Sequence, residues 1–218
     1  MQGLIISVSR VDVRFIFLAV VTITMFALSG IHNNEVYWGD STILSALRVD
    51  DETWRQFFAW FDITVPISIG SVLSVSAGLW VFRKRLEAMS SLFILPAMVL
   101  TIMLPKFLVG RPRPEGELAG MTNSFPSGTA ATSIMLLGFL IFLVGEFVGP
   151  RKLRLGLQVS LGIAIVPLGV FRILAGEHWP SDLAGAYMAG ALALFAIIGL
   201  YRTLQQGGRW SISGRSAA

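Results

Sequence analysis

The stretch LPKFLVGRPRPEGE, residues 104–117, closes a long apolar run and then turns polar. It places Lys106, Arg111 and Arg113 within eight positions of one another. A lysine or arginine near the end of a membrane-spanning helix often extends to the lipid headgroups, which is an ordinary explanation for any one of them. Three such cations close together also suggest a bound anion. The rest of the chain helps to distinguish an anion site from ordinary contact with the headgroups.

The composition of the chain is that of an integral membrane protein. Of the 218 residues, 54% are hydrophobic and only 14% are charged, and the mean hydropathy is +0.71. A soluble domain of this length carries far more charge on its surface. The chain has no cysteine, which excludes disulfides, thiolate catalysis and cysteine-ligated metals. The formal net charge of +4 is modest and does not indicate nucleic-acid binding.

Apolar segments divide most of the sequence and predict membrane-spanning helices. They cover approximately 13–31, 62–82, 88–105, 127–149, 155–174 and 183–201. Each approaches the roughly 20 residues that a helix needs to cross a bilayer core. Strands of a transmembrane barrel, the alternative, would alternate apolar and polar residues, and these segments do not. We therefore predict an all-α integral membrane protein, a bundle of six transmembrane helices forming a single domain over residues 1–218, with the first helix retained rather than cleaved.

The distribution of Lys and Arg predicts the orientation of this bundle. With six spans both termini share one side, and that side carries eleven of the seventeen cations. Because cytoplasmic loops are rich in Lys and Arg, we expect the termini in the cytoplasm, including a flexible tail at about 202–218. The polar loop 32–61 then lies outside, in the periplasm if the membrane is a bacterial inner membrane. The same outer side carries four cations at span ends, Lys106, Arg111, Arg113 and Arg172.

A second stretch on the predicted outer side, NSFPSGTAATS, covers residues 123–133. Ser127 can cap the helix that follows, and Gly128 allows a ligand to approach the backbone closely. The free N–H groups at such a helix start suit a phosphate. An ordinary N-cap explains the same residues equally well when they are taken alone.

A third outer stretch, FRILAGEHWPSD, covers residues 171–182 and contains one of the two histidines of the chain. His178 and Asp182 are spaced to share one face of a helix that starts near Trp179. A carboxylate beside an imidazole fixes its tautomer and leaves the other ring nitrogen free to attack. Cations, an N–H-rich turn and an oriented histidine on one membrane face indicate phosphoryl transfer.

These three stretches together resemble the type 2 phosphatidic acid phosphatase superfamily, whose motifs are K-x6-R-P, P-S-G-H and S-R-x5-H-x3-D. The first motif is complete from Lys106 to Pro114, and the second reads PSGT at residues 126–129. The third reads FRILAGEHWPSD at residues 171–182. The order and spacing of the motifs and the six predicted spans all agree, so the resemblance covers nearly the whole chain.

The resemblance implies a lipid phosphatase that works without metal or cofactor, on a lipid phosphate held in the bilayer. It assigns phosphate binding to Lys106, Arg113, Arg172, Ser127 and Gly128. It makes His178 the nucleophile, forming a phosphohistidine that water hydrolyses, with Asp182 orienting the ring and Arg172 among the catalytic groups. No role carries over to Arg111.

Two positions depart from the family pattern. Phe171 stands in place of a serine, and Thr129 stands in place of the histidine that protonates the leaving group. A hydroxyl cannot serve as a general acid near neutrality, and such help is typically worth about 10²–10⁴-fold. A phosphate leaving from a lipid diphosphate needs little help, whereas the alkoxide of a phosphatidate needs a proton. Thr129 therefore favours a diphosphate or a sugar-linked lipid phosphate, unless His32, water or the substrate supplies the proton.

Three functions follow, and hydrolysis is favoured over the other two. A phosphatase would act on a lipid such as polyprenyl diphosphate, a sugar-linked lipid phosphate or phosphatidate. A phosphotransferase would pass the phosphoryl group from His178 to a second lipid. A catalytically weakened protein would bind a lipid phosphate without turnover, which Thr129 and Phe171 motivate. The sequence indicates neither the lipid, nor the oligomeric state, nor whether Thr129 is an engineered residue.

Overall fold

The computed structural model describes residues 13–31, 37–61, 65–114 and 123–213, and the regular structure in these ranges is helical. The elements in chain order are α1 (Val13–Ile31), α2 (Asp40–Leu47), α3 (Glu52–Ala59), α4 (Val65–Val81), α5 (Arg85–Leu92), α6 (Ile94–Met98), the π-helical η1 (Val99–Met103), α7 (Leu104–Val109), α8 (Gly128–Phe147), α9 (Arg151–Leu174) and α10 (Pro180–Ser213). The predicted all-α class is confirmed for the described part of the chain.

In the part of the chain that the structure describes, each predicted apolar segment is mostly helical, although the helices differ in length. Among the described residues, four helical stretches are long and apolar enough to cross a membrane: Arg85–Val109, Gly128–Phe147, Arg151–Leu174 and Pro180–Gln206. Two shorter apolar helices, Phe15–Ser29 and Pro66–Val81, occupy the positions of the first two predicted spans. The count of six crossings therefore stays a prediction. The last helix continues beyond Tyr201, where the sequence analysis ended it, as far as Ser213.

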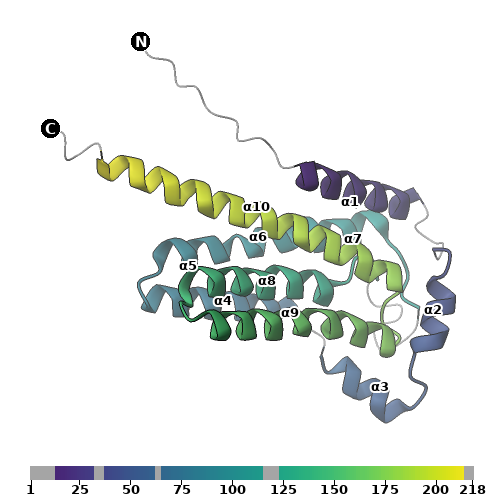
Figure 1. The fold of residues 1–218 in the computed structure, drawn as a ribbon. Helices are drawn as coiled ribbons and strands as arrows, with labels where there is room; N and C mark the ends of the chain where they lie inside the picture. Colours follow the sequence, from purple (N-terminus) through teal and green to yellow (C-terminus); the bar gives the residue numbers. More distant parts are fainter. Residues whose placement is uncertain (1–12, 32–36, 62–64, 115–122, 214–218) are drawn as a thin grey trace.

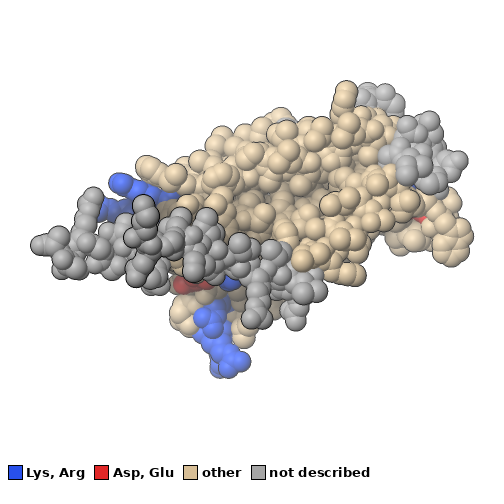
Figure 2. Space-filling view, turned by 90° about the horizontal axis from the view of Figure 1, so that it is seen from above, with Lys and Arg blue, Asp and Glu red and all other residues tan. Residues whose placement is uncertain are grey.

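The long helices run alongside one another, so the molecule has two ends (Figure 1). We call one the α2–α3 end; it holds α2, α3 and the start of α10. We call the other the α4–α5 end; it holds the turn between α4 and α5 and the turn between α8 and α9. Figure 2 shows an almost entirely uncharged face between these ends, with basic side chains gathered toward one of them. Such a face suits the hydrocarbon of a bilayer, where a charged side chain is costly.

Helix α8 packs against both α9 and α10, and its contact with α10 depends on small residues. A Cβ at Gly190 would come within 2.2 Å of the Ile134 side chain and 2.9 Å of the Ala131 carbonyl oxygen. A Cβ at Gly138 would meet Leu194 at 2.4 Å. Small residues at these positions let the two helix backbones approach closely, which is the usual basis of helix association in a membrane.

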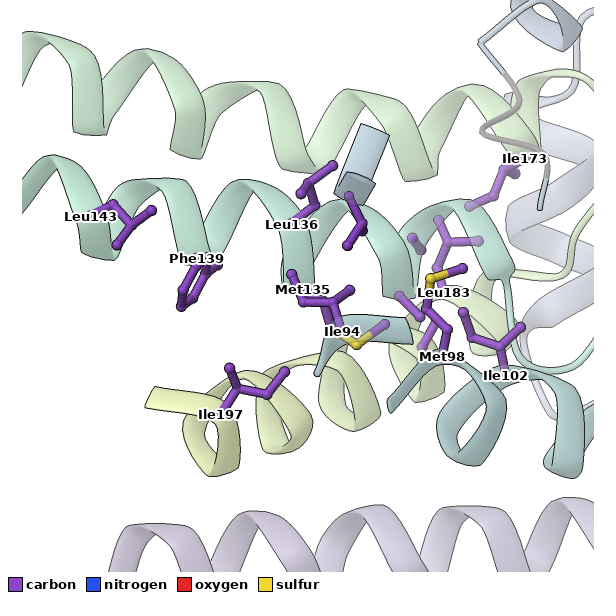
Figure 3. Packing of buried hydrophobic residues seen from close by; sticks show 14 of the residues in the cluster. Ile94, Met98, Ile102, Met135, Leu136, Phe139, Leu143, Ile173, Leu183 and Ile197 are labelled. Carbon is purple, nitrogen blue, oxygen red and sulfur yellow. The ribbon is translucent and has the colours of Figure 1, made fainter. Parts of the chain in front are cut away.

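The buried apolar cluster fills the space between the three central helical stretches (Figure 3). Met135 and Phe139 of α8 are fully buried there. Ile94 and Ile102 reach the cluster from the 85–109 helix, and Leu183 reaches it from α10. This packing fixes the start of α10 against α8, and residues of the second and third sequence motifs lie at that junction.

The polar loop predicted at 32–61 is wrong in its described part, because α2 and α3 lie within it. Asp51 caps α3, since its side chain accepts a hydrogen bond from the Trp54 backbone N–H at 3.1 Å. Asp40 begins α2 and is only 3% exposed. The many charged residues of this segment led to the prediction of a loop, whereas the structure has two short helices there, and α2 contains the buried carboxylate of Asp40.

Candidate active site

The third motif is built where α9 ends and α10 begins. Helix α10 starts at Pro180, close to the start expected from the sequence, so Asp182 lies in its first turn and His178 lies two residues before the helix. The His178 Nδ1 atom is 3.2 Å from Asp182 Oδ2, and both side chains are buried. The same carboxylate oxygen accepts the Trp179 backbone N–H at 2.9 Å. The expected histidine–carboxylate pair is therefore present, with its oxygen held by the helix start.

The other ring nitrogen of His178 faces Arg113. The Arg113 Nη1 atom lies 3.2 Å from His178 Nε2 and also donates to the Glu177 carbonyl oxygen at 2.7 Å. It is 3.3 Å from the Glu177 carboxylate as well. A guanidinium has only donors, so Nε2 accepts in this contact and the ring proton lies on Nδ1, where it donates to Asp182. The lone pair of Nε2 is thus directed toward the guanidinium.

Lys106 joins the first motif to the second. Its Nζ atom donates to the Asn123 carbonyl oxygen at 2.7 Å and to the Ser124 carbonyl oxygen at 3.2 Å. The Asn123 side-chain amide donates back to the Lys106 carbonyl oxygen at 2.8 Å. These bonds hold the end of α7 beside the segment that leads into α8.

The second motif forms the start of α8 and touches α10. Ser127 is the N-cap, as expected, and its Oγ atom accepts the Ala130 N–H at 3.5 Å. The Ser127 backbone N–H donates to the Asp182 carbonyl oxygen at 3.2 Å, so this turn is fixed to the third motif. Thr129 is 2% exposed in the first turn of α8. A Cβ at Gly128 would make only an ordinary contact with Ile102 at 3.6 Å, so packing does not require glycine there.

Arg172 is buried near the end of α9 and is linked to His178 through the backbone. Its carbonyl oxygen accepts the N–H groups of Glu177 at 3.0 Å and His178 at 3.2 Å. Its Nη1 atom donates to the Ala59 carbonyl oxygen of α3 at 3.2 Å. Because Arg172 is 2% exposed and Arg111 is 1% exposed, neither side chain extends to the headgroups, and that explanation is wrong for these two residues.

Phe171, the second departure from the family pattern, packs against α3. Its ring centroid is 5.1 Å from that of Phe58 and 4.9 Å from that of Phe61. An aromatic residue at this position therefore fastens α3 over the end of α9, next to Arg172. The hydroxyl of a serine would be too short to make this contact.

Sequence reasoning missed a second group of buried polar residues around Asp182. Arg111 donates to Asp182 Oδ1 at 2.9 Å and to Asp40 Oδ2 at 2.8 Å. Ser181 and Glu177 were also not singled out, although Ser181 bonds to Asp40 and Glu177 pairs with Arg113. The one feature of the sequence that could have indicated this group is the presence of Arg111 and Asp40 in so apolar a chain. His32, considered as an alternative acid, lies outside the described residues.

Among the residues that the structure describes, no three His, Asp or Glu side chains are grouped as metal ligands would be. The site places Arg113 against His178, with Arg172 joined to the same turn through its backbone and Lys106 bonded to the segment that leads into α8. What it can do chemically is hold an anion beside Nε2, which is free of the ring proton.

Comparison with known proteins gives the same family as the motifs. The model of the PAP2 superfamily matches residues 86–206, more than half of the chain. Phosphatidylglycerophosphatase B of Bacillus subtilis (strain 168) is 23% identical over 181 residues, covering 78% of this chain and 87% of that protein. The crystal structure of a transmembrane PAP2-type phosphatidylglycerolphosphate phosphatase from Bacillus subtilis superimposes with a TM-score of 0.73 at 21% identity, over 87% of this chain and 96% of that one. The chain therefore belongs to the PAP2 superfamily, that of the type 2 phosphatidic acid phosphatases.

Proposed function

We propose that this protein hydrolyses a lipid phosphate or diphosphate through a phosphohistidine at His178. The observation that carries the proposal is the ring of His178, held by Asp182 at Nδ1 and facing Arg113 at Nε2. In a membrane protein of this family, that arrangement supports attack by Nε2 on phosphorus. A phosphate oxygen would take the place that Nε2 now holds against the Arg113 guanidinium.

Each step of the reaction uses a named group. Nε2 of His178 forms a bond to phosphorus as the bond to the leaving oxygen breaks, and the ring becomes cationic. Asp182 stabilises that cation through Nδ1–H, while the phosphate-binding group consists of Lys106, Arg113, Arg172, Ser127 and the Gly128 backbone. Water then attacks the phosphohistidine, and inorganic phosphate leaves. None of these steps uses a metal or a cofactor.

An apolar cavity supports a lipid as the substrate. Its volume is about 930 Å³, within the range of ligand pockets, and it lies between α1, the 85–109 helix and α10. Pro105 and Val109, which flank Lys106 in α7, belong to its lining, as do Phe26 and Ala193. A lipid tail in this cavity would leave its headgroup near the end of α7, where the first motif begins.

The membrane orientation is part of the same proposal. Lys84, Arg85 and Arg151 are exposed at the α4–α5 end, as expected for a cytoplasmic face, so the α2–α3 end would face outward. In a bacterial inner membrane the substrate phosphate would then lie on the periplasmic side.

Two classes of lipid fit, and they differ in the leaving group. The name of the B. subtilis relative points to phosphatidylglycerophosphate, a phosphomonoester whose alkoxide needs a proton. Thr129 supports a lipid diphosphate, or a sugar-linked lipid phosphate, whose leaving group is the weaker base. Thr129 also favours the second candidate function, a binder that turns lipid phosphate over slowly or not at all.

The deciding experiment measures phosphate release by purified protein in EDTA. A lipid diphosphate, a phosphatidate and phosphatidylglycerophosphate are compared, with His178→Ala as the control. Release that depends on His178 from any of them supports hydrolysis, and the preferred lipid identifies the leaving group. Release that His178→Ala leaves unchanged contradicts the mechanism. Label that passes to an added acceptor lipid indicates a phosphotransferase, and lipid binding without release indicates a binder.

A further inference from the structure

The mechanism above does not use Arg111, although Arg111 and Arg172 are the two largest fully buried side chains of the described residues. Its Nη1 atom donates to Ser181 Oγ at 2.7 Å and to Asp182 Oδ1 at 2.9 Å. Its Nη2 atom donates to Asp40 Oδ2 at 2.8 Å. A buried guanidinium is retained only where such partners offset the cost of removing it from water.

Asp40 completes this cluster from α2. Its Oδ1 atom accepts the Ser181 backbone N–H at 2.9 Å, and its Oδ2 atom accepts the Ser181 hydroxyl at 2.6 Å as well as Arg111. One aspartate of a distant segment thus holds both the first turn of α10 and the arginine that binds Asp182. The side chains of Asp40 and Asp182 are 4% and 0% exposed, so water does not compete for these bonds.

Aromatic rings confine the guanidinium from two further sides. The Arg111 Cζ atom lies 5.0 Å from the ring centroid of Tyr37 and 5.9 Å from that of Trp179. The Tyr37 hydroxyl is bonded to Ser29 at 2.7 Å and donates to the Met25 carbonyl oxygen at 3.2 Å, which anchors that ring to α1. Arg111 is therefore held by hydrogen bonds and by two aromatic rings, and it binds one oxygen of Asp182.

The two oxygens of Asp182 have separate tasks. Oδ1 is held by Arg111, and Oδ2 holds the Nδ1–H of His178. Rotation of the carboxylate would move both oxygens together, so fixing Oδ1 also fixes the direction of Oδ2. In metal and triad sites alike, a second group that holds the orienting carboxylate keeps the imidazole in its productive tautomer.

We propose that Arg111 and Asp40 are positioning residues, which set the Asp182 carboxylate so that His178 presents Nε2 to the phosphate. They act through Asp182 and do not touch the substrate. The reading of His178 as the nucleophile rests on the proposed function. The orientation of the His178 ring is independent of the proposed function, and it can be measured without turnover.

The first test observes the ring of His178 directly. The chain has two histidines, so ¹⁵N-histidine labelling gives two ring systems, and His32→Gln assigns them. We expect the spectrum of the otherwise unchanged protein to show the proton on Nδ1 of His178. Arg111→Met should give a mixture of the Nδ1-H and Nε2-H tautomers of His178. Asp40→Asn should likewise lower the population of the Nδ1-H tautomer. Arg111→Lys should largely retain the Nδ1 form. A His178 spectrum that all three variants leave unchanged overturns the proposal.

The second test is a double-mutant cycle on turnover. With Asp182 present, we expect Arg111→Met to lower kcat about 100-fold with KM changed by less than about threefold, because the loss lies in the transition state. In an Asp182→Asn protein the same change should cost less than about threefold, because the group through which Arg111 acts is already disabled. Equal losses in both backgrounds, or a change in KM alone, would contradict the proposal.

Folding and function are separated in the same experiment. Thermal unfolding in detergent identifies a variant that fails to fold. If Arg111→Met does not fold, the His178 spectrum and the double-mutant cycle are measured with Asp40→Asn and Arg111→Lys. A protein that folds but releases no phosphate from any lipid contradicts the proposed function. The His178 spectra still decide whether Arg111 and Asp40 position the ring.

Discussion

The two ends of the bundle hold basic side chains in opposite ways. At the α4–α5 end Arg83, Lys84 and Arg85 are exposed, and Lys84 has its Nζ atom 4.0 Å from the centroid of the Phe147 ring. At the α2–α3 end Arg111 and Arg172 are buried. An exposed cation at a membrane surface stays hydrated, so it has little desolvation penalty, and its position indicates the membrane orientation. A buried cation loses its hydration and needs hydrogen-bonding partners from other parts of the fold. The contrast indicates that the α2–α3 end is the candidate site for chemistry.

The largest effect is expected when one cation is removed from each end of the bundle. We expect Arg172→Ala to lower kcat/KM for lipid phosphate by about 10²–10³-fold, because a preorganised donor to the transferring phosphoryl group is lost. Arg151→Ala, at the exposed end, should stay within about twofold. Phosphate release from vesicles measures both. Similar losses for the two variants would mean that burial does not distinguish the functional cations.

A second experiment restores the missing acid at the start of α8. We expect Thr129→His to raise turnover of phosphatidate by about 10-fold or more, because an imidazole can protonate the alkoxide leaving group. Turnover of a lipid diphosphate should change by less than about threefold. Thr129→Asn is the matched control for size, since an amide does not titrate. Equal gains with both lipids would show that Thr129 does not set the leaving-group preference.

A third experiment compares a crowded position of α10, Gly190, with an open position further along the same helix, Gly199. Gly190→Ala should lower the free energy of unfolding by about 1–3 kcal/mol, because its Cβ would overlap Ile134 and the Ala131 carbonyl. Gly199→Ala should be neutral or slightly stabilising, because a Cβ there would meet nothing within 4 Å. Thermal unfolding in detergent tests the pair. Equal stability of the two variants would remove the argument that close packing of α8 and α10 holds the site.

The smallest expected effect concerns the aromatic contact that fastens α3. Phe171→Ser should weaken the docking of α3 by about 0.5–1.5 kcal/mol, as expected for the loss of an aromatic pair. Faster amide hydrogen exchange within Glu52–Ala59, the residues of α3, would report this. Phe147→Ser, at the opposite end, is the control and should leave exchange in α3 unchanged. Unchanged exchange in the Phe171 variant would mean that α3 is held by other contacts.

Local patterns in the sequence predicted much of the site. The pairing of His178 with Asp182 was predictable because the two residues are only four positions apart, where α10 begins. Ser127 was recognised as an N-cap for the same reason, since capping involves only neighbours in sequence. Burial of Arg111 was not predictable in this way, because its partners Asp40 and Asp182 are each 71 residues distant. The segment with α2 and α3 was misjudged for a related reason, as short helices with charged residues depend on what they pack against.

Three features were predictable from the amino-acid sequence alone: a helical membrane protein, the motifs of its family, and the pairing of His178 with Asp182. Each of these follows from composition or from residues close together in the chain. Three features became visible only in the folded chain: Arg111 bonds both Asp182 and Asp40, Phe171 packs against α3, and an apolar cavity reaches the neighbourhood of Lys106. These depend on the packing of distant segments, because the free energy of a buried charge or ring is set by the groups that enclose it.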